Sequence, residues 1–202
     1  MRVHGAGRTD AGVHALGQVA SAVVTFTHPA ATLVRALNAH LPEDVRVLEV
    51  VDASDSFHAR FSARAKTYRY QLRAGAVGDP FTRAFVWQMP EKLDVEAMRV
   101  AAAVLVGTHD FGAFRSAGTE VSSCVRTITR SEWVESELLV YEVTGDGFLR
   151  HMVRAIVGTL VEIGRGWRGA DSMVQLLASG TRAQAGATAP AQGLFLVRVD
   201  YD

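Results

Sequence analysis

The sequence predicts an α+β fold, and three observations predict it. The chain has 202 residues, of which 49% are apolar, so it can bury a substantial core in one large or two small domains. Some segments are rich in β-branched or alternating aromatic residues, whereas others repeat apolar residues at helical spacing. Strand and helix segments follow one another in an order that is typical of helices packed on one face of a mostly antiparallel sheet.

The first group of elements is expected between residues 18 and 53. Residues 18–26, QVASAVVTF, have the β-branched content of a strand. Pro29 precedes AATLVRALNAHL, whose apolar spacing predicts an amphipathic helix that Pro42 ends. Residues 45–53 are expected to form a second strand.

The second group is longer. Strands are expected at residues 65–74, 124–134, 138–145 and 193–201. Helices are expected at residues 95–106, 148–164 and 171–178. Asp94 is expected to cap the N-terminus of the helix at 95–106, and Gly107 to be the C′ residue of that helix. In the helix at 148–164, Arg150 and Arg154 are expected to share one flank, because they are four residues apart.

Both groups have the elements of a ferredoxin-like unit, the scaffold of RNA-recognition motifs. We therefore expect two such α/β halves, residues 1–60 and 61–202, with a boundary near 55–63 and a central cleft. Their mostly antiparallel sheet would carry helices on one face.

Composition and charge narrow the function classes. A single cysteine, Cys124, cannot form an internal disulfide, and neither a secretory signal nor a membrane-spanning run is recognisable, which favours a cytoplasmic protein. The net charge is zero, which argues against a nucleic-acid partner, but the signs are segregated. Residues 56–78 contain no acid and five basic residues: Arg60, Arg64, Lys66, Arg69 and Arg73. A positive cleft and a coding bias toward arginine explain this equally well.

The stretch GAGRTDAGVHALGQ, residues 5–18, places one carboxylate among very small side chains. It lacks the spacing of a phosphate-binding loop, so its purpose would be to present Asp10. In an extended segment Arg8 would point to the same side as Asp10, and a guanidinium there favours an ionised nucleophile or base. The alternative is an aspartate that caps a turn.

Three further residues have two interpretations each. Tyr68 and Tyr70 are either packing residues or, beside Lys66, a stacking platform for a base. Arg154 lies among apolar neighbours, so it either extends to the surface or pairs with a buried carboxylate, for which Asp10 is the natural candidate. The histidines lack metal-ligand spacing, and His151 stands alone, so no metal site is expected.

Five segments together resemble the tRNA pseudouridine synthase A family, in the order that the family has them. They are GRTDAGVHA (7–15), KTYRYQL (66–72), GTHDFGAFRSAG (107–118), FLRHMVRAIVGTLVEIGRG (148–166) and GLFLVRVDY (193–201). The resemblance covers nearly the whole chain. It implies isomerisation of uridine to pseudouridine at positions 38–40 of the tRNA anticodon stem-loop, without a cofactor or metal, by a homodimer.

The resemblance also implies roles for individual residues. Asp10 would be the essential catalytic residue, and Arg154 would pair with its carboxylate. Arg8 would displace and hold the flipped nucleotide, Tyr68 would stack on the uracil, and Leu194 would line its pocket. The basic residues Arg60, Arg64, Lys66 and Arg150 are expected to contact tRNA phosphates.

The chain departs from the family at its start, because only Met1 to Ala6 precede the GRTD segment. We expect the family's first strand and helix to be missing, which would leave an uncovered sheet edge and exposed apolar surface. Made alone, the chain is expected to be poorly soluble and weakly active. The alternatives are a catalytically impaired RNA-binding fragment and, more remotely, an unrelated small-molecule enzyme with Asp10 as base.

Overall fold

A computed structural model describes residues 1–75, 77–116, 118 and 121–201. The chain divides into two compact units. The small unit comprises Met1–Ala6 and Val19–Ser62, and the large unit comprises Gly7–Gln18 and Ala63–Asp202. The segment that carries Asp10 therefore leaves the small unit and belongs to the large one, a discontinuity that no linear division of the sequence can express.

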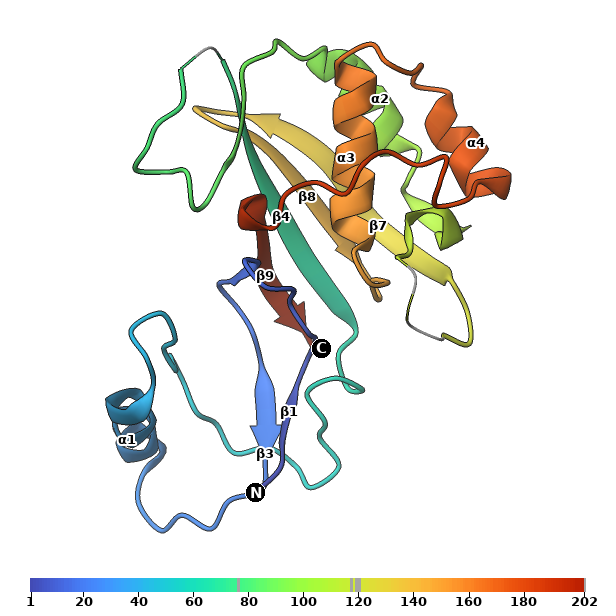
Figure 1. The fold of residues 1–202 in the computed structure, drawn as a ribbon. Helices are drawn as coiled ribbons and strands as arrows, with labels where there is room; N and C mark the ends of the chain where they lie inside the picture. The colour runs from blue at the N-terminus through green and yellow to red at the C-terminus, as the bar shows by residue number, and fades with distance from the viewer. Residues whose placement is uncertain (76, 117, 119–120, 202) are drawn as a thin grey trace. The chain divides into compact units, whose positions relative to one another are not determined.

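The small unit contains a two-stranded antiparallel sheet and one helix (Figure 1). Strand β1 (Val3–Gly5) pairs with β3 (Ala20–Ala22), so only three residues of the strand expected at 18–26 form. Helix α1 (Ala30–His40) confirms the expected helix, which ends before Pro42. None of its residues is buried, and several large apolar side chains of this unit are exposed: Val23, Val24, Phe26, Leu37, Val45, Leu48 and Val51.

The strand expected at residues 45–53 is wrong, and at Val47 the side chain of Asn38 takes the backbone groups that a strand ladder would use. Asn38 Oδ1 accepts a hydrogen bond from the backbone N–H of Val47 at 2.8 Å. The Asn38 Nδ2 group donates to the Val47 carbonyl, also at 2.8 Å. A strand needs these backbone groups for a neighbouring strand, but an amide side chain from α1 occupies them.

The large unit is built on a seven-stranded sheet in the order β2-β9-β4-β8-β7-β6, with β5 beside β4. The long central strands are β4 (Ala65–Ala74), β7 (Val125–Glu135), β8 (Leu139–Gly145) and β9 (Leu194–Asp200). All of their mutual pairings are antiparallel, which confirms the predicted sheet. Three short strands were not predicted: β2 (His14–Ala15), β5 (Trp87–Met89) and β6 (Gly107–Asp110).

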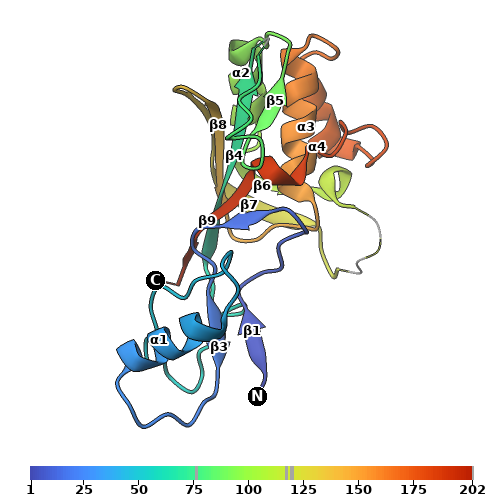
Figure 2. The same cartoon turned by 60° about the vertical axis from the view of Figure 1, so that its left-hand side comes forward.

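Helices α2 (Val95–Ala103), α3 (Met152–Gly164) and α4 (Ser172–Ser179) confirm the other expected helices and lie over one face of this sheet (Figures 1 and 2). The core between the two layers includes fully buried Tyr70 and Leu72 from β4. Asp94 caps α2 as predicted, since its Oδ1 accepts from the Ala97 N–H at 2.9 Å. Among the described residues, no helix combines the length and the apolar character needed to span a membrane.

Two expected helix ends were wrong. Helix α2 ends at Ala103, and Gly107 opens β6 with a φ of +118° instead of ending the helix. Helix α3 begins at Met152, four residues later than predicted, because His151 before it has a left-handed φ of 61°. Arg150 therefore precedes the helix and does not share a helical flank with Arg154.

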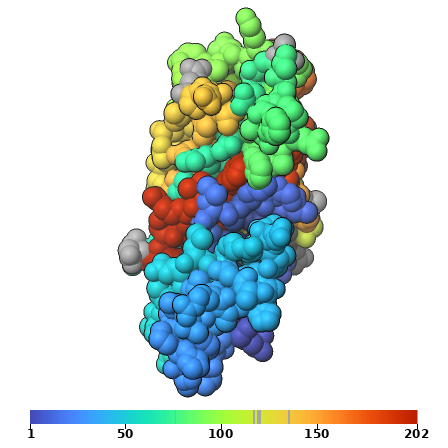
Figure 3. All heavy atoms as spheres, turned by 90° about the vertical axis from the view of Figure 1, so that its left-hand side faces the viewer, coloured from blue at the N-terminus to red at the C-terminus, as the bar shows by residue number. Residues whose placement is uncertain are grey.

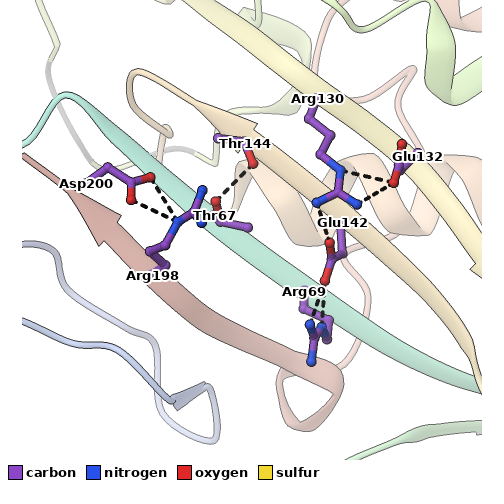
Figure 4. Close-up of polar contacts among 8 residues, drawn as sticks. All are labelled: Thr67, Arg69, Arg130, Glu132, Glu142, Thr144, Arg198 and Asp200. Atoms are coloured by element: carbon purple, nitrogen blue, oxygen red, sulfur yellow. Dashed lines mark hydrogen bonds and ion pairs between the residues drawn. The ribbon is translucent and has the colours of Figure 1, made fainter. Parts of the chain in front are cut away.

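The helix-free face of the sheet carries paired charges (Figure 4). Glu142 on β8 lies between two guanidinium groups, 2.7 Å from Arg69 Nη2 and 2.7 Å from Arg130 Nη1. Thr67 and Thr144 hydrogen-bond across the strands at 2.9 Å, and Arg198 pairs with Asp200 at 2.8 Å. Arg69 pairs with Glu142 on this face of the sheet. Since successive side chains of β4 point to opposite faces, Tyr68 and Tyr70 point to the other face.

Candidate active site

The segment Gly7–Gln18 is held as a loop against the sheet of the large unit. Its strand β2 pairs parallel with β9, with His14 opposite Phe195. The Leu16 N–H donates to the Leu196 carbonyl at 2.8 Å, and His14 Nε2 lies 2.9 Å from the Ala84 carbonyl. Figure 3 shows the segment in blue against the red atoms of the C-terminal strand. These contacts fix the chain on the C-terminal side of Asp10.

Asp10 opens a tight turn within this loop. Its carbonyl accepts a hydrogen bond from the Val13 N–H at 3.0 Å, and Gly12 has a φ of +81°. A positive φ at the third position is what a type II turn requires, and glycine adopts it without a steric penalty. The backbone therefore makes this turn, and the Asp10 carboxylate makes its contacts elsewhere.

The carboxylate of Asp10 is paired with Arg154 of helix α3. Arg154 Nη1 lies 3.0 Å from Asp10 Oδ2, which is the pairing proposed from the sequence. The Arg154 Nε–H donates to the Ala189 carbonyl at 2.7 Å, and the Ala189 N–H donates back to the Arg154 carbonyl at 3.0 Å. The Arg154 side chain is only 15% exposed and that of Asp10 33%. Arg154 is thus anchored on both sides, while the carboxylate remains reachable.

Tyr68 lies close enough to Asp10 for the carboxylate to affect its pKa. Burial, and then the negative charge of Asp10, raise the pKa of the Tyr68 phenol to about 12. The ring of Tyr68 packs edge-to-face on Phe148, with 5.0 Å between the ring centroids. Tyr68 is therefore a neutral, half-buried ring at neutral pH beside the carboxylate.

Leu194 begins strand β9 directly opposite Tyr70 on β4. It is buried and belongs to the same apolar cluster against which Tyr68 and Val13 pack. The Tyr70 hydroxyl donates to the Pro190 carbonyl at 2.8 Å, which fixes the chain just before Leu194. The segment that anchors Arg154 and the strand that begins with Leu194 are therefore continuous.

The basic residues predicted to contact the nucleotide or tRNA are mostly exposed. Arg8 is exposed on the Asp10 loop, and no ion pair joins it to Asp10 within the described contacts. Arg64 and Arg150 are exposed in the large unit, and Lys66 on β4 is half-buried. Arg60 belongs to the small unit, where its guanidinium lies 5.7 Å from the centroid of the Phe61 ring.

His151 is a further member of this site, which the sequence did not predict. His151 Nε2 lies 3.2 Å from Asp10 Oδ2, and its Nδ1 lies 2.8 Å from Ser116 Oγ. His151 lies three residues before Arg154, but its contact with Asp10 depends on its left-handed φ, for which the sequence carries no signal.

The arrangement is suited to nucleophilic or base chemistry. A carboxylate with one oxygen held by donors offers its other oxygen to a bound molecule. A neutral aromatic ring beside it can support a planar base by stacking. Both features come from elements of one unit, because Asp10, Tyr68 and Arg154 all belong to the large unit.

Comparison with known proteins identifies the family of this chain. A family model described as tRNA pseudouridine synthase matches residues 1–62 and 101–202. The chain is 46% identical over 203 residues to the tRNA pseudouridine synthase A of Geobacillus sp. strain WCH70, covering all of this chain and 82% of that protein. It is 47% identical to the enzyme of the same name from Anoxybacillus flavithermus, covering all of this chain and 82% of that protein. For the Chloroflexus aurantiacus enzyme the identity is 49%, covering 97% of this chain and 72% of that protein. From the match over most of its length, this chain belongs to the tRNA pseudouridine synthase A family.

Proposed function

We propose that this chain isomerises uridine to pseudouridine at positions 38–40 of the tRNA anticodon stem-loop, with Asp10 as its catalytic residue. The observation that carries the proposal is the 3.0 Å pair between Asp10 Oδ2 and Arg154 beside the Tyr68 ring. The names of the relatives supply the substrate, tRNA, and the product, pseudouridine.

The reaction exchanges one bond to the ribose for another. The target nucleotide leaves the stack, at a cost of a few kcal/mol, so that the enzyme reaches its base and sugar. Asp10 then either attacks the nucleotide or removes a ribose proton, and the bond between C1′ and N1 breaks. The uracil turns, C5 bonds to C1′, C5 loses its proton and N1 gains one. No electrons are exchanged with another molecule.

The neighbouring residues take roles that fit their positions. Arg154 holds the Asp10 carboxylate in place, since its second anchor on Ala189 fixes the guanidinium. Tyr68 stacks on the uracil, and Leu194 lines the apolar side of the base pocket. Arg8, exposed on the same loop as Asp10, displaces and holds the flipped nucleotide.

The proposal extends to the partners of the chain. Arg60, Arg64, Lys66 and Arg150 contact tRNA phosphates, for which arginine is well suited. The enzyme acts as a homodimer in the cytoplasm, where its tRNA substrate and its single unpaired cysteine both belong. Light scattering of the purified chain at several concentrations measures the dimer directly.

Tritium release from tRNA that carries C5-tritiated uridine tests the reaction. The chain is expected to release tritium from such a tRNA, and to release none when positions 38, 39 and 40 all carry cytidine. Salt-sensitive tRNA binding without tritium release would instead support the alternative, a catalytically impaired RNA-binding fragment. Release from both tRNAs would contradict the assignment of the positions.

A further inference from the structure

His151 has both of its ring nitrogens engaged at the candidate active site. Nε2 lies 3.2 Å from Asp10 Oδ2, and Nδ1 lies 2.8 Å from Ser116 Oγ. The side chain of His151 is 22% exposed, less than that of Asp10 at 33%. The imidazole therefore connects the serine to the carboxylate in a line, Ser116 to His151 to Asp10.

The backbone at His151 is in an unfavourable conformation. Its φ of 61° and ψ of 6° lie in the left-handed region, which for a residue with a branched or bulky side chain costs about 1–2 kcal/mol. Glycine or asparagine adopts this region more readily. The His151 carbonyl nevertheless accepts the hydrogen bond of the Ala155 N–H at 2.9 Å, so the residue is the point where α3 starts.

The two contacts of the imidazole favour one neutral tautomer. An ionised carboxylate offers only acceptors, so the 3.2 Å approach of Nε2 to Asp10 Oδ2 suits a proton on Nε2. In the neutral imidazole Nδ1 is then an acceptor, and the Ser116 hydroxyl can donate to it. The Ser116 N–H donates to the Arg150 carbonyl at 3.1 Å, which holds the serine beside the start of α3.

Arg154 and His151 bind the same oxygen of the carboxylate. Arg154 Nη1 and His151 Nε2 lie 3.0 and 3.2 Å from Oδ2. In the described part of the chain, no hydrogen bond engages Asp10 Oδ1. The hydrogen bond from Arg154 and the close approach of His151 to the same oxygen restrict the rotation of the carboxylate and leave the other oxygen available to the substrate.

We propose that His151 is a positioning residue which, together with Arg154, binds Oδ2 of Asp10 so that Oδ1 is the oxygen that reacts with the nucleotide. The inference rests on the proposed function. It assigns the reacting atom for both possible first steps, because nucleophilic attack and proton abstraction each need one free carboxylate oxygen. Ser116 acts one step further away, by holding the imidazole in the tautomer that donates from Nε2.

Two amide variants separate the hydrogen bond from the backbone. In His151→Gln the amide nitrogen takes the place of Nε2, whereas in His151→Asn it reaches only to the place of Nδ1. Asparagine suits the left-handed backbone better than glutamine. The proposal predicts that His151→Gln keeps more of kcat than His151→Asn, while a purely structural role of His151 predicts the reverse order.

His151→Gly removes the ring and suits the backbone best. We expect kcat to fall about 10- to 100-fold, the effect of a misplaced catalytic group, with KM for tRNA within about twofold. Added imidazole is expected to restore part of kcat in His151→Gly and to leave His151→Asn unchanged. Wild-type kcat in His151→Gly, or a change confined to KM, would overturn the proposal.

A measurement without turnover separates this inference from the proposed function. In a ¹⁵N-labelled wild-type chain, nuclear magnetic resonance of the histidine rings reports which nitrogen of His151 carries the proton. We expect protonated Nε2 in the wild type and a changed signal in Asp10→Asn. A neutral Nδ1–H tautomer would overturn the role of His151 even if the chain is active. An inactive wild type with protonated Nε2 would contradict the proposed function alone.

Discussion

Arg154 is the residue on which the geometry of the Asp10 carboxylate depends most. Its guanidinium uses two different nitrogens, Nη1 toward Asp10 and Nε toward the Ala189 carbonyl. Lysine carries one compact ammonium group and cannot reproduce this pair of directions. The ion pair is partly exposed, so its contribution to stability is smaller than that of a fully buried pair.

We therefore predict that Arg154→Lys affects catalysis more than stability. The variant should lose about 10- to 100-fold in kcat, and about 1–2 kcal/mol of unfolding free energy. Enzyme kinetics and urea denaturation measure the two effects. Arg198→Lys, in an exposed pair with Asp200, is the matched control and should change stability by less than about 0.5 kcal/mol. Equal losses of kcat and of unfolding free energy in both variants would contradict a role of Arg154 in catalysis.

At this scale the sequence predicted some contacts and missed others for clear reasons. The pairing of Asp10 with Arg154 was predictable, because a cation among apolar neighbours needs an anion and few anions were candidates. The role of His151 was not, because its contact depends on a left-handed φ at the start of α3. Such a backbone conformation has no signature in a histidine-containing segment that otherwise has the pattern of a continuous helix.

Strand β4 carries two of the four tyrosines whose phenol pKa the fold raises. Burial, and then the charge of Asp10, raise the pKa of Tyr68 to about 12. Burial also raises the pKa of Tyr70, against the opposing effect of Arg154, and that of Tyr141, against the opposing hydrogen bond from Ser131. In the unfolded chain these phenols would ionise near pH 10.

The stability of the large unit is therefore expected to fall at alkaline pH. The contribution of each neutral phenol is fully present below pH 10 and is lost as the pH rises through the folded-state pKa, about 12 for Tyr68. The unfolding free energy should fall by at most about 1.4 kcal/mol per pH unit for each tyrosine. Urea denaturation between pH 9 and 11.5 measures this slope. Tyr68→Phe should make it shallower, and an unchanged slope would contradict the burial of that phenol.

Helix α3 and the segment before β9 approach each other at Gly158. A Cβ on Gly158 would lie 1.7 Å from the Ala187 carbonyl oxygen. The same segment continues to Ala189, whose carbonyl anchors Arg154. The absence of a side chain at Gly158 therefore allows the contact that positions the arginine.

Gly158→Ala is predicted to destabilise the chain, although alanine normally favours a helix over glycine. The clash with backbone should lower the unfolding free energy by about 3 kcal/mol or more, and kcat should fall because the anchor of Arg154 moves. Thermal unfolding and kinetics test both effects. Gly7→Ala is the control, since its Cβ would be 3.7 Å from the nearest atom, Lys66 Nζ. A Gly158→Ala variant as stable as this control would show that the segment does not pack there.

Elements were predictable from local patterns where local forces decide them. The alternation in β4 and the Asp94 cap of α2 were correct, because side-chain period and capping act within a few residues. The strand at 45–53 was wrong, and at Val47 a side chain from α1, Asn38, takes the backbone groups instead. The short strands β2 and β5 were missed, because only their partners β9 and β4 make them strands.

Each of the two units is built from two separate stretches of the sequence. Local sequence patterns cannot predict such an arrangement. The loop with Asp10 lies between two parts of the small unit in sequence but belongs to the large unit in space. The α+β class and the helix-covered antiparallel sheet were predictable, since they follow from the order of elements. Which unit receives residues 7–18 depends on the pairing of His14 with Phe195, some 180 residues apart.

Binding of tRNA is a property of the whole molecule and should depend on salt. Arg60→Gln and Arg64→Gln are each predicted to weaken binding and to reduce the slope of log affinity against log salt by about 1. Filter binding across 50–300 mM salt measures the slope. Arg99→Gln on α2, whose Nη1 lies 3.5 Å from Glu96, is the control and should leave it unchanged. Equal slopes in all three variants would remove Arg60 and Arg64 from the tRNA surface.

The central claim is that the carboxylate of Asp10 performs the chemistry and is not needed to bind tRNA. Single-turnover formation of pseudouridine, with enzyme in excess and tRNA affinity measured in the same samples, tests it most directly. Asp10→Asn keeps the shape of the side chain and removes its charge. The account predicts no detectable pseudouridine from Asp10→Asn and a tRNA Kd within about twofold of the wild type. Pseudouridine formed at a near wild-type rate, or a loss of affinity as large as the loss of rate, would contradict it.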